Sequence, residues 1–144
     1  MSIITDLLRW FLGNAEGLPR KRVFISFAME DKPFRDHLVN QAKQERTPFH
    51  FVDMSVKKPW NQNIWKKRCR SKIKGCDGVI VLLSKNTYHA GGARWEMKCA
   101  NEEGVPMVGM HAKKNDRGTR PPELNGKRVI IWTWKNLERV IDSF

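Results

Sequence analysis

The residue best placed to do chemistry in this sequence is Glu96, which follows a buried apolar run and a polar loop. The run Val79 to Leu83 is short and β-branched at its start, which is typical of a strand buried on both faces in a parallel sheet. The polar loop 84–92 leads into a helix predicted from about residue 93. Because ligands of open α/β sheets bind at the carboxyl ends of the strands, we expect Glu96, in the first turn of that helix, to lie at the mouth of a site.

The sequence lacks the residue patterns that other common kinds of catalytic site require. The four histidines are scattered and show no HExxH or similar spacing, so we expect no metal site. Ser26 and Ser84 end predicted strands, but neither lies in a GxSxG turn. The three cysteines form no CxxC pair, and an odd number without a disulfide framework suits a reducing cytoplasm.

A single carboxylate cannot supply a general acid and a separate base, but it can stabilise a developing cation. Breaking an N-glycosidic bond to nicotinamide needs little else, because the leaving group is already cationic in the substrate. The transition state has oxocarbenium character, as in sugar hydrolysis, and a carboxylate near the ribose stabilises it more than the ground state. The alternative for Glu96 is a structural glutamate at a helix start, favoured by the helix dipole.

The elements that must position this carboxylate alternate along the chain. The 144 residues suit one domain, and Asp31 before Pro33 is a good N-cap for the first helix of that domain. The polar stretch 113–126 is expected to be a surface loop. The alternation predicts a flavodoxin-like, three-layer α/β/α fold with a five-stranded parallel sheet in the order 2-1-3-4-5. Its predicted strands are 22–28, 49–52, 79–83, 105–111 and 128–132, and its predicted helices are 32–44, about 60–74, about 93–103 and 134–144.

Residues 1–21 are predicted to form an amphipathic N-terminal helix and linker before a domain at 22–144. Apolar residues recur at helical spacing from Ile3 to Leu12, and Gly13, Gly17 and Pro19 end the pattern. The helix could pack on its own domain, dock a partner chain or lie on a membrane surface. The last option is the weakest, because Arg9 is the one basic residue of its polar face.

The net charge of +12 favours anionic partners. The helix at about 60–74 carries six outward Lys and Arg residues, and its core-facing positions are Ile64 or Trp65 with Cys69 and Ile73. The simpler interpretation of this basic face is that it is solvated. The alternative, which is not favoured, is a docking surface for nucleic acid on which Trp60 and Trp65 could stack bases. No run of about 18 apolar residues is present, so we expect no membrane span, and we expect a cytoplasmic protein.

Several segments in order resemble the TIR-like domain family of bacteria, and most of all the TIR-like subunit of Thoeris anti-phage defence systems. The segments are Arg22 to Phe27, Glu30-Asp31, Ile73 to Leu83, Asn86-Thr87 and Arg94-Trp95-Glu96, and the match covers roughly residues 22–112. The resemblance implies a flavodoxin-like fold and an enzyme that takes NAD as its substrate and needs no cofactor. Such enzymes release nicotinamide and form a cyclic ADP-ribose-type signal that activates an effector.

The resemblance also implies the site residues. Glu96 matches the catalytic glutamate, and Trp95 beside it fits a Trp-Glu pair common in the TIR-like branch. The loop after the first strand would border the nicotinamide ribose, the loop after the third strand would line the pocket, and a basic loop could meet the diphosphate. The substrate-binding residues implied in these places are Ser26, Phe27, Ala28, Met29, Lys57, Ser84, Asn86, Tyr88 and Trp95.

One position departs from the family. Many TIR domains have a tryptophan four residues before the catalytic glutamate, where this chain has Gly92. This departure keeps open a second hypothesis, a non-catalytic TIR-like module that assembles with partners through its surfaces. A third hypothesis is a nucleic-acid binder that works through the basic helix at about 60–74. TIR enzymes often self-associate to complete their pocket, so self-association through TIR surfaces or the N-terminal helix is also expected.

Overall fold

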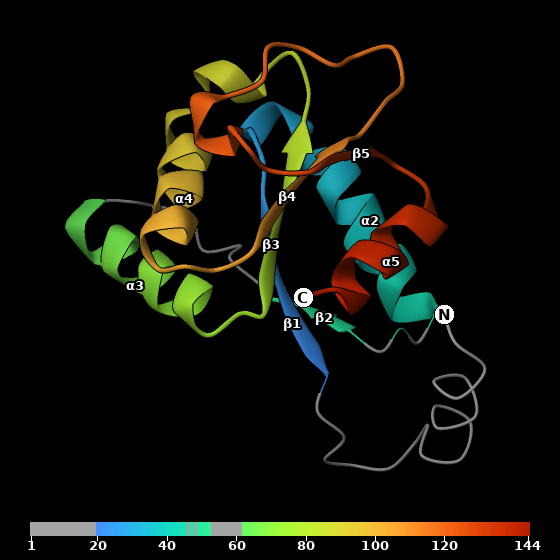
Figure 1. Ribbon diagram of the computed structural model, residues 1–144, viewed down its shortest axis with the longest axis horizontal. Coiled ribbons are helices and arrows are strands. Elements are labelled where there is room, and N and C mark those ends of the chain that lie inside the picture. The colour runs from blue at the N-terminus through green and yellow to red at the C-terminus, as the bar shows by residue number, and fades with distance from the viewer. Residues whose placement is uncertain (1–19, 46, 48, 53–61) are drawn as a thin grey trace.

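A computed structural model of the chain describes residues 20–45, 47, 49–52 and 62–144 (Figure 1). Its sheet has five parallel strands in the order β2-β1-β3-β4-β5, which confirms the predicted fold class and strand order. The strands are β1 (Lys21–Ser26), β2 (Phe49–Phe51), β3 (Gly78–Leu83), β4 (Met107–His111) and β5 (Val129–Ile131).

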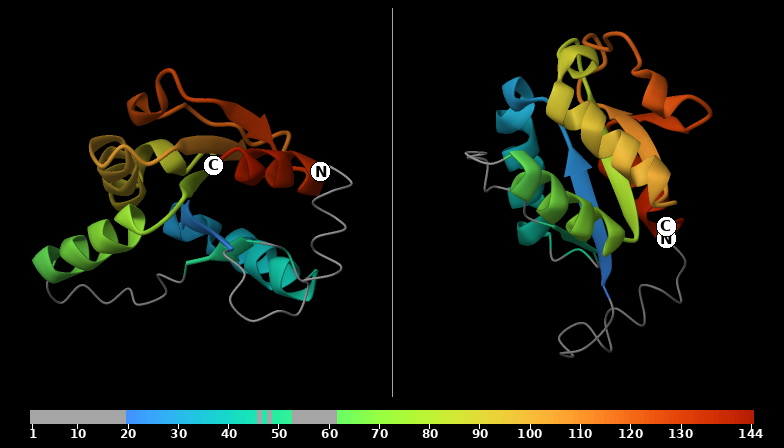
Figure 2. Two further views of the ribbon diagram at one scale, coloured as in Figure 1. Left: turned by 60° about the horizontal axis from the view of Figure 1, so that its bottom comes forward. Right: turned by 90° about the vertical axis from the view of Figure 1, so that its left-hand side faces the viewer.

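Helices cover both faces of the sheet (Figures 1 and 2). The helices α3 and α4 lie on one face, and α2 and α5 lie on the other. Three short 3-10 helices, η1 (Met29–Asp31), η2 (Thr87–His89) and η3 (Pro122–Leu124), lie in the connections. The bounds of the longer helices are Lys32–Gln44 for α2, Gln62–Lys74 for α3, Gly91–Glu102 for α4 and Trp134–Asp142 for α5.

The central strand β3 divides the core into two layers. Every residue of β3 is buried, and alternate side chains point to opposite faces of a strand. Val79, Val81 and Leu83 pack with α3 and α4, whereas Ile80 and Leu82 pack with α2 and α5. The unbroken apolar run in the sequence follows from this double burial.

Helix α4 begins at Gly91, two residues earlier than expected. Glu96 is consequently the sixth residue of the helix, its first turn holds no acidic residue, and the expectation of a first-turn position was wrong. Two glycines weaken a helical pattern in a sequence, but burial of Ala93 against the sheet fixes the helix start here. The structural alternative of a glutamate favoured by the helix dipole loses its basis, because that effect fades beyond the first turn.

The stretch 113–126 is not only a surface loop. It contains η3, and Leu124 within it is fully buried. Its side chain meets those of Leu83 and Val129 around Gly109, where a Cβ would come within 2.9 Å of Leu83. A single apolar residue in a polar stretch has no periodicity, so the sequence pattern missed this contact.

The expected N-terminal helix and linker at 1–21 lie outside the described residues. Within the part of the chain that the structure describes, no helix is long and apolar enough to cross a membrane.

Leu124 should contribute to stability as a core residue. We expect Leu124→Ala to lower the free energy of unfolding by about 2–5 kcal/mol, because it removes buried methyl groups and leaves a cavity. Urea denaturation followed by circular dichroism measures the change. Ile131→Ala, at a side chain that is 38% exposed, is the matched control; an equal loss in both variants would contradict a core role for Leu124.

Candidate functional site

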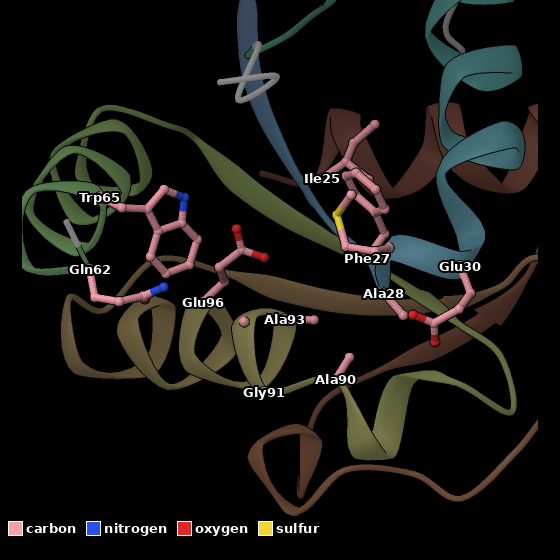
Figure 3. Close-up of a pocket in the computed structure, with 12 residues that line it drawn as sticks. Ile25, Phe27, Ala28, Glu30, Gln62, Trp65, Ala90, Gly91, Ala93 and Glu96 are labelled. Atoms are coloured by element: carbon pink, nitrogen blue, oxygen red, sulfur yellow. The ribbon is translucent and has the colours of Figure 1, made fainter. Parts of the chain in front are cut away.

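A pocket of about 420 Å³ opens where the loop after β1 meets the amino-terminal ends of α3 and α4 (Figure 3). Its size is within the range of small-molecule sites, and its place beside the end of β1 fits the rule for open α/β sheets. Apolar and small residues make up most of its wall. It is lined by Ile25, Phe27, Ala28, Met29, Glu30, Gln62, Trp65, Ala90, Gly91, Gly92, Ala93 and Glu96.

Glu96 lies in the second turn of α4 and lines this pocket. It is only 9% exposed to solvent. The Ser26 hydroxyl donates to Glu96 Oε1 at 2.9 Å and also lies 3.2 Å from the Ala93 carbonyl oxygen. Ser26 is the last residue of β1 and is fully buried. Strand alternation turns Ser26 towards α4 while its neighbour Ile25 packs on the opposite face.

The second carboxylate oxygen of Glu96 is met by a thiol. Cys69 Sγ lies 3.5 Å from Glu96 Oε2. Burial raises the pKa of the Cys69 thiol far above its ordinary value, and the negative charge of Glu96 raises it further. The thiol therefore stays protonated at neutral pH and donates to the carboxylate instead of competing with it for a cation.

The residues expected to border the substrate after β1 come together here. Phe27, Ala28 and Met29 line the pocket beside Glu96. Ser26 does not line the pocket, but its hydroxyl holds the carboxylate that does. Lys57 lies outside the described residues.

Ser84 and Asn86 do not line this pocket but join its loops. The Ser84 hydroxyl donates to Asp31 Oδ2 at 2.6 Å, and Asn86 Nδ2 donates to Asp31 Oδ1 at 3.3 Å. Asp31 occupies the N-cap position of α2 as expected, yet its side chain makes no capping hydrogen bond. Its carboxylate instead ties the loop after β1 to the loop after β3.

Tyr88 and Trp95 also lie outside the pocket wall. The Tyr88 ring stacks beneath the Arg94 guanidinium, 5.1 Å from it. Trp95 packs against Trp65, with ring centroids 5.5 Å apart. In this arrangement both residues support elements that border the pocket.

Sequence reasoning missed several lining residues. The sequence predicts a core or base-stacking position for Trp65, and the family resemblance includes Glu30 but implies no role for it. Gln62 gave no signal, because its position depends on how α3 packs on α4. The bare position Gly92 faces Trp65, whose Cη2 lies 3.8 Å from where a Cβ would be.

The described residues bring together no group of three metal-ligating side chains. They place one buried carboxylate, oriented by a hydroxyl and a thiol, in a mainly apolar pocket. Such a group can stabilise positive charge that develops on a bound molecule. The exposed carboxylate of Glu30 lies at the other end of the same pocket in Figure 3.

The basic face of α3 is partly neutralised by α4. Arg70 pairs with Glu103 at 2.7 Å and with Glu102 at 3.7 Å, and Lys74 lies 3.9 Å from Glu103. These ion pairs join two of the six basic residues of α3 to α4.

Comparisons with known proteins agree with this geometry. A sequence model of the family described as "Thoeris protein ThsB, TIR-like domain" matches residues 24–117. Among solved structures, the TIR domain of the Toll-related receptor TRR-2 from Hydra magnipapillata is similar, with a TM-score of 0.64 and 19% identity over 83% of this chain and 97% of that one. The CMP N-glycosidase BcmB of Clostridium botulinum is similar with a TM-score of 0.53 and 19% identity, over 85% of this chain and 96% of that one. At such identities the likenesses show the fold. No curated protein sequence matches the chain.

The hydrogen bonds from Ser84 and Asn86 to the Asp31 carboxylate should stabilise the loops around the pocket. We expect Asp31→Ala to lower the free energy of unfolding by about 1–3 kcal/mol, because it leaves the buried Ser84 hydroxyl without its acceptor. Hydrogen exchange at residues 84–87 should speed up as well. Asp116→Ala is the control, since Asp116 accepts from the exposed Lys85 amide of the same loop. Equal effects of the two variants would contradict the tie.

The pairing of Arg94 with Glu123 should make stability depend on pH. Burial alone would raise the pKa of Glu123, but hydrogen bonds from Arg94 and the backbone, with the charge of Arg94, lower it below the ordinary 4.5. A lowered folded pKa means that the stabilisation is present above pH 4.5 and is lost as the pH falls through the folded value.

We therefore expect Glu123→Gln to flatten the loss of stability on acidification in that range, as measured by thermal unfolding at a series of pH values. The control is Glu102→Gln, at a longer ion pair with Arg70. An unchanged pH profile for Glu123→Gln would contradict the assignment.

Proposed function

Because the chain belongs to the family of TIR-like domains of the Thoeris protein ThsB, we propose that it is an anti-phage defence enzyme that cleaves NAD between nicotinamide and ribose. The observation that carries the proposal is the buried Glu96 carboxylate in the wall of a small-molecule pocket. The likeness to a CMP N-glycosidase supports it further, since that protein acts on another nucleotide N-glycosidic bond in the same fold.

The proposed reaction needs little from the protein beyond a placed negative charge. The bond between the ribose C1′ and the pyridinium nitrogen breaks, and its electron pair goes to the nitrogen, so that neutral nicotinamide leaves. Positive charge then moves to C1′ and the ring oxygen of the ribose. A carboxylate beside the ribose stabilises this oxocarbenium-like state more than the substrate, which lowers the barrier.

The second step decides the product. A nucleophile from the ADP-ribose part of the same molecule attacks C1′ and loses a proton, which gives a cyclic ADP-ribose-type product. Attack by water instead would give linear ADP-ribose and a proton. We propose that the first outcome prevails and that the cyclic product is the signal that activates a separate effector.

The remaining residues take supporting roles in this proposal. Phe27, Ala28 and Met29 contact the nicotinamide ribose, and Ser26 orients Glu96. Lys57 meets the diphosphate. Self-association, a cytoplasmic location and the diffusible effector signal are proposed from the family alone.

Glu96→Gln should lower the rate of nicotinamide release by about 100- to 1,000-fold, the size of effect seen when one electrostatic stabiliser is removed. The full chain is incubated with NAD, with and without a lysate of phage-infected cells, and nicotinamide and cyclic products are quantified by mass spectrometry.

Glu138→Gln is the matched control, because it makes the same change on α5, on the other face of the sheet, and should leave nicotinamide release within the range of the wild type. Wild-type release by Glu96→Gln would overturn the catalytic assignment. Absence of any NAD conversion by the wild type in both conditions would favour the non-catalytic module.

A further inference from the structure

Trp65 is the largest aromatic side chain in the pocket wall, and it comes from α3 and not from the helix that carries Glu96. In Figure 3 its indole reaches from α3 towards the Glu96 carboxylate, while Phe27 lies beyond that carboxylate on the other side. Trp65 is partly buried and packs on the core layer between the sheet and α3 and α4.

The indole of Trp65 is fixed from behind. Trp95 of α4 packs against it at 5.5 Å between centroids, with the ring planes 46° apart. The Trp95 ring in turn lies under two cations of α3, Lys66 at 5.8 Å and Arg70 at 5.7 Å. Since Arg70 is held by Glu103 at 2.7 Å, this stack restricts the orientation of Trp65 before any ligand binds.

The position across from Trp65 on α4 carries no side chain. A Cβ on Gly92 would lie 3.8 Å from Trp65 Cη2, so even alanine would touch the ring, and any longer side chain would cover its edge or displace it. Both Gly92 and the neighbouring Gly91 line the pocket, and a Cβ on Gly91 would meet no atom within 4 Å, so no side chain at these two positions covers the indole.

We infer that Trp65 is a specificity-determining residue that binds the planar, positively charged pyridine ring of the substrate by stacking and cation–π attraction. The inference rests on the proposed function, since it takes NAD as the substrate class. Tryptophan is the best aromatic partner for a cation, and stacking tolerates any flat ring. In this arrangement the indole of Trp65 binds the pyridine ring, and Glu96 stabilises the positive charge that develops on the ribose.

This assignment has a kinetic consequence. The pyridine ring is cationic in the substrate and neutral after the bond breaks, so attraction to the indole is stronger in the ground state than in the transition state. Removing the indole should therefore raise KM for NAD without lowering kcat. A merely structural role for Trp65 would affect kcat through Glu96 as well.

The test measures binding separately from turnover. Isothermal titration of NAD and of ADP-ribose, which lacks the pyridine ring, is carried out on the full chain carrying Glu96→Gln, alone and combined with Trp65→Ala or Trp65→Phe. We expect Trp65→Ala to weaken NAD binding by about 5- to 150-fold, the range for loss of one stacked ring, and to leave ADP-ribose binding unchanged. Trp65→Phe should restore most of the NAD affinity.

Trp132→Phe is the control for loss of an indole elsewhere, because Trp132 packs with Phe34 and Trp134 on the other side of the sheet, and thermal unfolding verifies that each variant is folded. Equal weakening of NAD and ADP-ribose by Trp65→Ala, or no weakening of either, overturns the inference. In both cases nicotinamide release by the otherwise wild-type chain leaves the proposed function standing. Absence of NAD binding and cleavage by the wild type overturns both.

Discussion

The hydrogen bond from Ser26 to Glu96 joins the sheet to the helix that carries the acidic group. It connects the last residue of β1 with the second turn of α4 at 2.9 Å, and both residues are buried. A buried carboxylate is costly unless hydrogen bonds satisfy it, so the Ser26 hydroxyl and the Cys69 thiol make its position tolerable. The same donors fix its orientation towards the pocket.

The loops around this carboxylate are held by polar contacts of a different kind. Asp31 binds Ser84 and Asn86 across the gap between two loops, and Arg94 binds Glu123 on the far side of α4. Rigid support of this sort places a site more precisely than loops alone. Beside the pocket, the loops after β1 and β3 are therefore tied to each other.

The fold could be predicted from the sequence because its signals are local. The apolar run of β3 and the alternation of strands and helices were enough for the topology, and the rule for the carboxyl ends of strands was enough to place Glu96 near a pocket. The start of α4 could not be predicted, because Gly91 and Gly92 have low helix propensity and the first turn is stabilised by tertiary packing. The burial of Leu124 could not be predicted, because hydrophobic periodicity needs several apolar residues at regular spacing and Leu124 is a single one in a polar stretch.

The composition of the site was harder to predict, since it depends on contacts between distant segments. Asp31 has the sequence context of an N-cap, and only the fold brings it to Ser84 and Asn86. Trp65 is 31 positions from Glu96 in the chain, and its place in the pocket follows from how α3 packs on α4. The absent family tryptophan at Gly92 suggested an impaired site, whereas the fold places another tryptophan beside that position.

The most direct measurement is a crystal structure of the full chain with Glu96→Gln in complex with NAD. The account predicts that C1′ of the nicotinamide ribose contacts the side chain at position 96, with the pyridine ring against Trp65. NAD bound at another surface, or bound in this pocket with its nicotinamide ribose directed away from position 96, would contradict it.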